Sequence, residues 1–184
     1  RLQGDWSSDV CSSDLDTTVD EYYEVIRGKT AALFAAAARV GPVLAGRSEA
    51  DAEALEAYGI NLGLAFQIVD DVLDYNADQK ALGKSIGDDF REGKVTLPVL
   101  LAFARGDDGA RAFWRRTIEH EDQKPGDLEQ AIAYLQETDA IAVSAKAARH
   151  FANEAKEALS SVRGDESISK ALADVADFCV ERAF

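Results

Sequence analysis

Apolar residues recur at helical spacing along almost the whole chain after residue 17. Within residues 141–162 they alternate steps of four and three, which places them in one narrow stripe along a helix. No useful stretch alternates apolar and polar residues as a strand does, and no segment repeats with the period of a solenoid. The pattern therefore predicts an all-α fold. The stripe consists of Ile141, Ala145, Ala148, Ala152, Ala155, Leu159 and Val162.

Capping and helix-breaking residues mark where these helices begin and end. Thr18 and Ser48 are each followed three residues later by an acidic residue, which is the spacing of a capping box. Gly41 and Pro42 predict that the first helix ends at about residue 40. Pro98 fits the first turn of a later helix, where its missing N–H costs nothing. The predicted helices cover residues 18–40, 49–75, a segment that begins near 98, 108–120, 127–137, 139–162 and 166–182, with a long polar loop over 76–95.

The charge balance narrows the classes of partner. The 184 residues include 20 Lys and Arg against 34 Asp and Glu, a formal net charge of −14, which argues against nucleic acid and anionic membrane surfaces. No apolar stretch approaches the roughly 20 residues that span a bilayer. Two cysteines are too few for a disulfide framework and no signal-peptide pattern is present, so we expect the protein to be located in the reducing cytoplasm. A small phosphate ligand neutralised by a metal ion remains compatible with these exclusions.

The first residues of the chain differ in character from the rest. The sequence contains no methionine, and residues 5–15 resemble one translated frame of a common sequencing-library adapter, without helix or strand period. We therefore expect residues 1–16 to be a non-native leader and residues 17–184 to be the C-terminal part of one longer domain. The alternative is a native polar loop. A continuous coding sequence through residues 5–15 in the parent gene would contradict the leader hypothesis.

The helix predicted over residues 49–75 ends in an acidic cluster. Gln67, Asp70, Asp71 and Asp74 fall within an arc of roughly 100° at helical spacing, so their side chains project together. Like charges there repel one another, and the helix dipole at a C-terminus adds to the repulsion. A hard divalent cation bound by one or two carboxylates and by substrate phosphates compensates, which favours Mg²⁺. The alternative is an ordinary solvated helix end.

Lysines accompany the acidic cluster. Lys84 and Lys94 lie in the loop that follows it, and Lys29 lies next to Thr30 on the apolar side of the first predicted helix. Lysines beside carboxylates are typical of phosphates that contact a metal ion on one side and ammonium groups on the other. The alternative for Lys29 is a side chain that extends to solvent.

Two glycines precede the aspartates on nearly the same helix face. Gly59 and Gly63 lie in the apolar part of the helix, before the acidic cluster. Glycines at helical spacing leave space beside a helix, which either a hydrocarbon chain or a closely packed neighbouring helix can fill. The sequence leaves both interpretations open.

Three segments carry a resemblance to a known family. They are Gly-Lys-Thr-Ala-Ala-Leu-Phe over residues 28–34, a segment over 59–75 that ends in Asp-Asp-Val-Leu-Asp-Tyr, and a segment over 82–98 that ends in Gly-Asp-Asp-Phe-Arg-Glu-Gly-Lys-Val-Thr-Leu-Pro. Their order, spacing and content resemble trans-isoprenyl diphosphate synthases, and the last segment most resembles the long-chain branch, which makes octaprenyl-type or decaprenyl-type chains for quinones. The resemblance begins at about Thr17 and is weakest after Arg105. It implies a bundle of antiparallel helices around a central cavity, with the N-terminal helices missing.

The resemblance also implies a reaction and a set of site residues. An allylic diphosphate ionises, isopentenyl diphosphate attacks the cation, and a proton is lost, with Mg²⁺ as cofactor and a homodimer as the complete assembly. The residues that the resemblance assigns are Asp70 and Asp74 for Mg²⁺, with Asp71 and Asp88 in support, Lys29, Lys84 and Lys94 for the phosphates, and Thr30 and Gln67 for the developing cation.

One departure from the family changes the expectation for this chain. The family has two facing aspartate-rich motifs, and only the second is present in this sequence. We therefore expect the polypeptide alone to be inactive or nearly so. The alternatives are a non-catalytic helical partner or regulatory subunit, and a relative that cyclises prenyl chains or joins them head to head. The retained acidic and basic residues argue against the first alternative, and the segment over 82–98 argues against the second.

Overall fold

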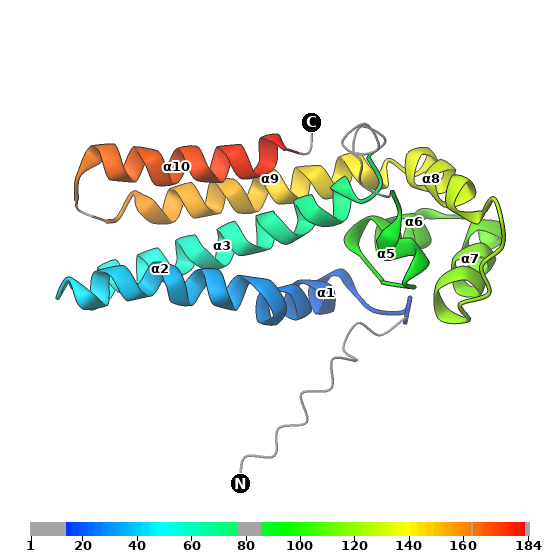
Figure 1. Ribbon diagram of the computed structural model, residues 1–184, viewed down its shortest axis with the longest axis horizontal. Coiled ribbons are helices and arrows are strands. Elements are labelled where there is room, and N and C mark those ends of the chain that lie inside the picture. Colours follow the sequence, from blue (N-terminus) through cyan, green and yellow to red (C-terminus); the bar gives the residue numbers. More distant parts are fainter. Residues whose placement is uncertain (1–13, 77–85, 163, 183–184) are drawn as a thin grey trace, which may run out of the picture.

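The computed structural model describes residues 14–76, 86–162 and 164–182, and all its regular elements there are helices (Figure 1). The prediction of an all-α fold is therefore confirmed. Within these described ranges, no helix is long and apolar enough to cross a membrane. The elements are α1 (Val19–Ile26), the π-helical η1 (Arg27–Ala31), α2 (Ala32–Leu44), α3 (Glu49–Leu73), α5 (Asp88–Arg91), α6 (Leu97–Arg105), α7 (Asp108–Trp114), the π-helical η2 (Arg115–Glu119), α8 (Asp127–Glu137), α9 (Ala140–Leu159) and α10 (Glu166–Glu181).

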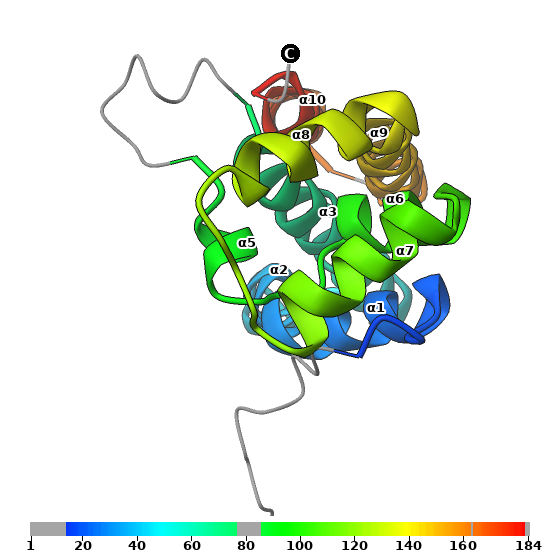
Figure 2. The ribbon, with the colours of Figure 1, turned by 90° about the vertical axis from the view of Figure 1, so that its right-hand side faces the viewer.

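Helix α3 lies in the middle of an elongated bundle. It packs against α2 on one side and along α9 on the other, and α10 covers both α9 and α3 (Figure 2). Its apolar residues, such as Leu64 and Ile68, are fully buried, as expected for a helix that is apolar around most of its circumference. The alanine stripe of α9 is buried as predicted from Ala145 to Leu159.

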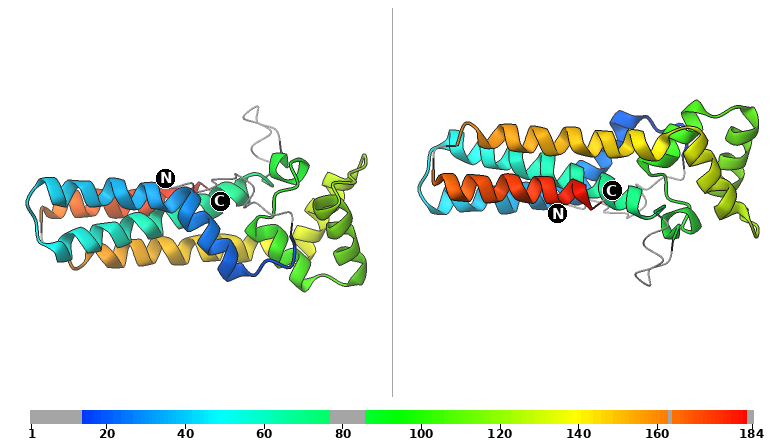
Figure 3. Two further views of the ribbon diagram at one scale, coloured as in Figure 1. Left: turned by 90° about the horizontal axis from the view of Figure 1, so that it is seen from below. Right: turned by 90° about the horizontal axis from the view of Figure 1, so that it is seen from above.

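A second hydrophobic cluster lies at one end of the bundle. It gathers α5, α6, α7, η2 and α8, which both views of Figure 3 place beyond the long helices. Phe90 of α5 packs against Phe113 and Trp114 within this cluster. Helix α6 joins the two parts, because Leu100 belongs to the bundle core and Val99 to the end cluster. The sequence predicted only a loop over 76–95, whereas the structure forms the short helix α5 there. The buried residue Phe90 fixes this helix on the end cluster.

The two glycines of α3 allow a close contact with η1 and α2. A Cβ atom at Gly59 would lie 2.5 Å from the carbonyl oxygen of Phe34, and one at Gly63 would lie 2.5 Å from the Cα atom of Ala31. Real Cβ atoms do not approach backbone atoms this closely, so only glycine permits this packing of α3 against η1 and α2. Of the two interpretations that the sequence left open, close helix packing is the correct one.

The predicted helix start at Thr18 is confirmed, and the predicted end at residue 40 is wrong. Thr18 accepts from the Glu21 backbone N–H, and the Glu21 carboxylate accepts from the Thr18 N–H at 2.8 Å, which completes the capping box. Pro42 lies inside α2, which continues to Leu44. The proline is tolerated because it lies in the last turn, where few hydrogen bonds follow it. Gly46, with φ of +63°, ends the segment instead.

The first described residues pack against the end cluster. Leu15 is buried there, and its backbone N–H donates to the Glu119 carboxylate at 3.3 Å. Asp16 forms an ion pair with Arg115 at 3.0 Å. Residues 1–13 lie outside the described ranges. The origin of residues 1–16 as a leader stays a prediction, and the parent gene sequence is its test.

Candidate functional site

A cavity of about 730 Å³ opens where the bundle meets the end cluster. Its walls come from residues 14–17, α1, η1, the C-terminal half of α3, and α5 with the residues that follow it, so segments far apart in the sequence meet there. The cavity therefore lies towards one end of the described bundle rather than along its middle. Its lining includes Tyr22, Lys29, Gln67, Asp70, Asp71, Asp89 and Lys94.

A π-helical turn brings Lys29 to this cavity. In Arg27–Ala31 the backbone hydrogen bond spans one residue more than in an α-helix, because the Ala32 N–H donates to the Arg27 carbonyl. Such bulges change the direction in which helix side chains project and recur at functional sites. Lys29 lines the cavity, and the neighbouring Thr30 donates from its hydroxyl to the Gln67 Oε1 atom at 2.7 Å.

The three aspartates at the C-terminal end of α3, Asp70, Asp71 and the cap residue Asp74, lie in three different environments. Asp70 is exposed and lines the cavity. Asp71 is buried, and its two carboxylate oxygens accept from the Tyr22 hydroxyl at 2.6 Å and from the Gln67 amide at 2.9 Å. Asp74 accepts from the backbone N–H groups of Asp88 and Asp89, each at 3.1 Å, and so caps α5.

Burial changes the acidity of two of these carboxyl groups. It raises the pKa of Asp71 to about 7, although the hydrogen bonds from Tyr22 and Gln67 act in the opposite direction. Burial, with the charge of Asp89 next in size, raises the pKa of Asp74 to about 6. The metal-free site therefore holds its acidic cluster at a cost, which a bound cation would reduce.

Without divalent ions, the free energy of unfolding should fall as Asp71 ionises. Because folding raises the pKa of Asp71, folding favours its neutral form, and the stabilisation is lost as the pH rises through about 7. Between pH 5 and pH 8, this group should account for about 2 to 3 kcal/mol. Urea unfolding of the parent and of Asp71→Asn should therefore diverge by that amount over this range. The exposed control Asp108→Asn should follow the parent, and parallel curves for Asp71→Asn would contradict the prediction.

Helix α5 and the residues that follow it supply the other charged groups. Lys94 pairs with Asp89 at 2.9 Å and with Glu92 at 2.6 Å, and these hydrogen bonds raise the pKa of Lys94 above its ordinary range. Asp88 pairs with Arg91 at 2.7 Å and does not line the cavity. Asp89 therefore presents a negative group to the cavity, and Lys94 presents a positive group from the same short segment.

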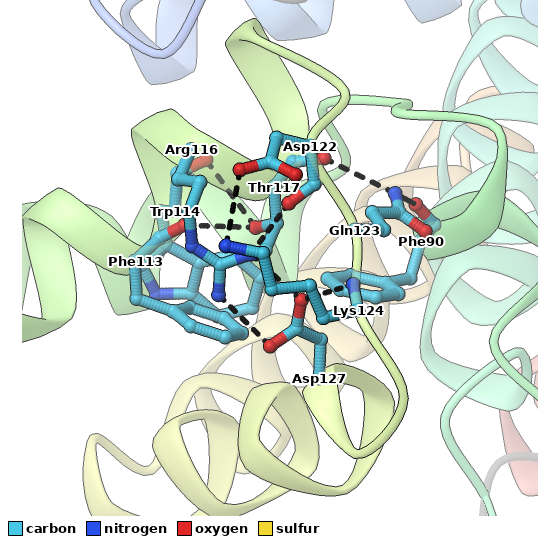
Figure 4. Close-up of polar contacts among 9 residues, drawn as sticks. All are labelled: Phe90, Phe113, Trp114, Arg116, Thr117, Asp122, Gln123, Lys124 and Asp127. Atoms are coloured by element: carbon cyan, nitrogen blue, oxygen red, sulfur yellow. Dashed lines mark hydrogen bonds and ion pairs between the residues drawn. The ribbon is translucent and has the colours of Figure 1, made fainter.

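Contacts with the end cluster hold this segment in place (Figure 4). The Gln123 side-chain amide donates to the Phe90 carbonyl at 2.7 Å and to the Thr117 carbonyl at 3.1 Å, which ties α5 to η2. Arg116 binds the Asp127 carboxylate through two hydrogen bonds of 2.8 Å each, which ties η2 to α8. The residues that present Asp89 and Lys94 to the cavity thus rest on a rigid support.

The structure brings together most of the residues that the sequence singled out. The cavity is lined by Lys29, Gln67, Asp70, Asp71 and Lys94. Thr30 is not part of the lining but donates a hydrogen bond to Gln67. Asp74 and Asp88 lie instead at the junction of α3 and α5. Lys84 lies outside the described residues.

Among the cavity residues that the sequence reasoning missed are Tyr22 and Asp89, which contact the predicted site residues Asp71 and Lys94. Asp89 had a signal, because it stands five residues before Lys94 in a turn-forming segment. Tyr22 had none, since its partner Asp71 is 49 residues away in the sequence.

The acidic residues here fit a metal ion that is shared with a ligand. Among the described residues, no three His, Cys, Asp or Glu side chains form a group that could hold a metal ion by themselves. Asp70 and Asp89 nevertheless line one cavity with Lys29 and Lys94. Carboxylates are the ligands that Mg²⁺ prefers, and it commonly completes its coordination with water and phosphate oxygens. The donor set therefore suits Mg²⁺ carried by a diphosphate.

Comparison with known proteins agrees with this chemistry. The family model described as polyprenyl synthetase matches residues 2–135. The octaprenyl diphosphate synthase of Haemophilus influenzae is 37% identical over 172 residues, which cover 94% of this chain and 52% of that protein.

Solved structures give the same result. A decaprenyl diphosphate synthase from Rhodobacter capsulatus has a TM-score of 0.88 and 46% identity, covering 95% of this chain and 54% of that one. A polyprenyl synthase from Caulobacter crescentus, solved with calcium and isoprenyl diphosphate, has a TM-score of 0.86 and 44% identity, covering 94% and 52%. The chain thus spans about half the length of these relatives. The family model, the fold and the shared segments together establish that the chain belongs to the polyprenyl synthetase family.

Proposed function

We propose that this chain is the diphosphate-binding half of a long-chain trans-polyprenyl diphosphate synthase that uses Mg²⁺. The observation that carries the proposal is the cavity in which Asp70 and Asp89 meet Lys29 and Lys94. Acidic residues for a cation and lysines for phosphate oxygens are the groups that a metal-bound diphosphate needs. Family membership supports prenyl diphosphates as the substrates. It likewise supports a homodimer in the cytoplasm for the complete enzyme.

In the proposed reaction, the C–O bond of an allylic diphosphate breaks and pyrophosphate leaves with the electron pair. The double bond of isopentenyl diphosphate attacks the resulting cation, a proton is lost, and the chain grows by one isoprene unit. Mg²⁺ held by Asp70, with Asp89 beside it, would neutralise charge on the leaving diphosphate. Lys29 and Lys94 would bind its oxygens, and Lys84 is proposed for the same role from the resemblance alone. The side-chain oxygens of Gln67 and Thr30 would face the cation.

Asp74 and Asp88 support this arrangement indirectly. The Asp74 carboxylate holds the backbone of Asp88 and Asp89, and Asp88 pairs with Arg91. We infer that Asp74 helps to place Asp89 at the cavity, in addition to the direct contact with Mg²⁺ that the resemblance implies. Asp71 has both oxygens bonded to Tyr22 and Gln67, so we assign it no direct contact with the metal ion.

Calorimetry of the chain with pyrophosphate tests the proposed function. We expect binding in the presence of Mg²⁺ and none when EDTA removes the ion, because the carboxylates repel an uncompensated anion. Sulfate at the same concentration serves as the control anion. Binding that ignores Mg²⁺, or binding of sulfate with equal affinity, would contradict a cavity built for a metal-bound diphosphate.

Lys94→Ala should weaken the binding of pyrophosphate with Mg²⁺ by about 1.5 to 3 kcal/mol. This is the range for a hydrogen bond to a charged group. Calorimetry measures the effect. Lys170→Ala on α10 is the matched control, since that lysine pairs with Asp174 and lies outside the cavity lining. Equal affinities for parent and Lys94→Ala would remove Lys94 from the site.

A further inference from the structure

A chain of hydrogen bonds joins α1, α3 and η1 beside the cavity. The Tyr22 hydroxyl donates to Asp71 Oδ2 at 2.6 Å, and the Gln67 Nε2 atom donates to Asp71 Oδ1 at 2.9 Å. The Thr30 hydroxyl donates to Gln67 Oε1 at 2.7 Å. Tyr22 and Asp71 are 5% and 4% exposed, so the hydrogen bond between them is shielded from bulk water, whereas the two hydrogen bonds of Gln67 are partly buried. The Tyr22–Asp71 pair is therefore a fixed part of the fold.

The chemistry of the members sets the direction of this chain. Because Gln67 Nε2 donates to Asp71 Oδ1, the Gln67 amide turns its NH₂ group towards Asp71 and its oxygen away from it. The Tyr22 hydroxyl occupies the second oxygen of Asp71, which fixes the rotation of the carboxylate. Thr30 then finds an amide oxygen as its partner and must donate its own hydrogen to it. A ligand that approaches Gln67 and Thr30 thus meets lone pairs rather than hydrogens.

We propose that Tyr22 is a positioning residue which, through Asp71, holds the Gln67 amide with its oxygen towards the cationic centre of the substrate. This inference rests on the proposed function. An oxygen turned towards a developing cation stabilises it, whereas the reversed amide would present N–H groups that repel it. Orienting the amide in advance also spares the substrate the cost of doing so. Tyr22 touches neither the diphosphate nor the cation in this proposal.

The neighbouring tyrosine offers a matched control. Tyr23 lies next to Tyr22 on α1, with ring centroids 5.7 Å apart, and packs edge-on against Phe151 at 5.2 Å. It takes no part in the chain of hydrogen bonds and does not line the cavity. Tyr22→Phe and Tyr23→Phe therefore make the same chemical change on the same helix, with only the first removing a hydroxyl from Asp71.

Nuclear magnetic resonance of the full chain at pH 8 tests the contact without any ligand. The side-chain NH₂ signals of Gln67 report its hydrogen bond to Asp71. We expect Tyr22→Phe and Asp71→Asn to shift or broaden these signals, and Tyr23→Phe to leave them in place. Gln67 signals that do not respond to Tyr22→Phe would overturn the proposal.

Binding of two probes in Mg²⁺ tests the consequence. Both are alkyl diphosphates of equal size, one neutral in its alkyl part and one with an ammonium group at the carbon that becomes cationic. Tyr22→Phe should reduce the preference for the ammonium probe about fivefold to tenfold, the effect of one hydrogen bond of ordinary strength, and leave the neutral probe unchanged. Equal losses for both probes, or an unchanged preference, would overturn the inference alone. Failure of the parent to bind either probe or pyrophosphate would overturn the proposed function, and the inference with it.

Discussion

Gly63→Ala should destabilise the chain by about 3 kcal/mol or more, the upper part of the range for overpacking a core. The added methyl group would lie 2.5 Å from the Cα atom and 2.9 Å from the Cβ atom of Ala31, so backbone has to move. Ala31 belongs to the π-helical turn that also contains Lys29. The same substitution should therefore weaken pyrophosphate binding in whatever fraction of the protein still folds.

Gly41→Ala provides the control for that experiment. Gly41 also lies within a helix, but a Cβ atom there would meet nothing within 4 Å beyond its own stretch of helix. Alanine at this position should change the free energy of unfolding by no more than about 1 kcal/mol, because its higher helix propensity is offset by the contact of its Cβ atom with the Pro42 ring. Urea unfolding followed by circular dichroism measures both variants. If Gly63→Ala were as stable as Gly41→Ala, the close contact between α3 and η1 would not exist in solution.

Asp70→Asn should reduce the affinity for pyrophosphate in Mg²⁺ at least about 100-fold, the upper end of the losses seen even for residues that only support metal ligands. Asp70 is the aspartate of α3 that is exposed to the cavity, whereas Asp71 and Asp74 spend their oxygens on protein donors. The amide keeps the size of the side chain and removes its charge. Stability should change little, because Asp70 is exposed.

Glu24→Gln separates a specific ligand from general negative charge. Glu24 lines the same cavity from α1 and pairs with Arg27 at 3.6 Å. Calorimetry in Mg²⁺ should find its affinity within about threefold of the parent, since an exposed ion pair contributes little. If Asp70→Asn also stayed within that range, Asp70 would not be a ligand of the metal ion.

Local signals in the sequence were sufficient for most of the helices. Thr18 and the alanine stripe of α9 act through contacts within one helix or one helix face, which spacing alone reveals. Pro42 misled because a proline is expected to end a helix at the residue before it, whereas α2 continues past Pro42 to Leu44. The π-helical turn at Lys29 had no local signal in the spacing of its residues, and its Ala31 packs against Gly63 of another helix.

The site residues likewise divide into those that local spacing predicted and those that depend on contacts between elements. Helical spacing correctly grouped Gln67, Asp70 and Asp71 on one stretch of α3, and the lysines followed from charge. Their separate environments could not be predicted, since they depend on partners from other elements, such as Tyr22 on α1 and the backbone of α5. Asp89 reaches the cavity because Phe90 and Gln123 fix α5 on the end cluster. Such contacts arise only when the whole fold is assembled.

A crystal structure of the chain grown with Mn²⁺ and pyrophosphate would test the account most directly, because anomalous scattering locates the manganese ion. We expect one ion in direct coordination to both an Asp70 oxygen and a pyrophosphate oxygen, with Lys29 and Lys94 on the same pyrophosphate. Pyrophosphate bound elsewhere on the protein, or bound in this cavity with no ion between it and the carboxylates, would contradict it.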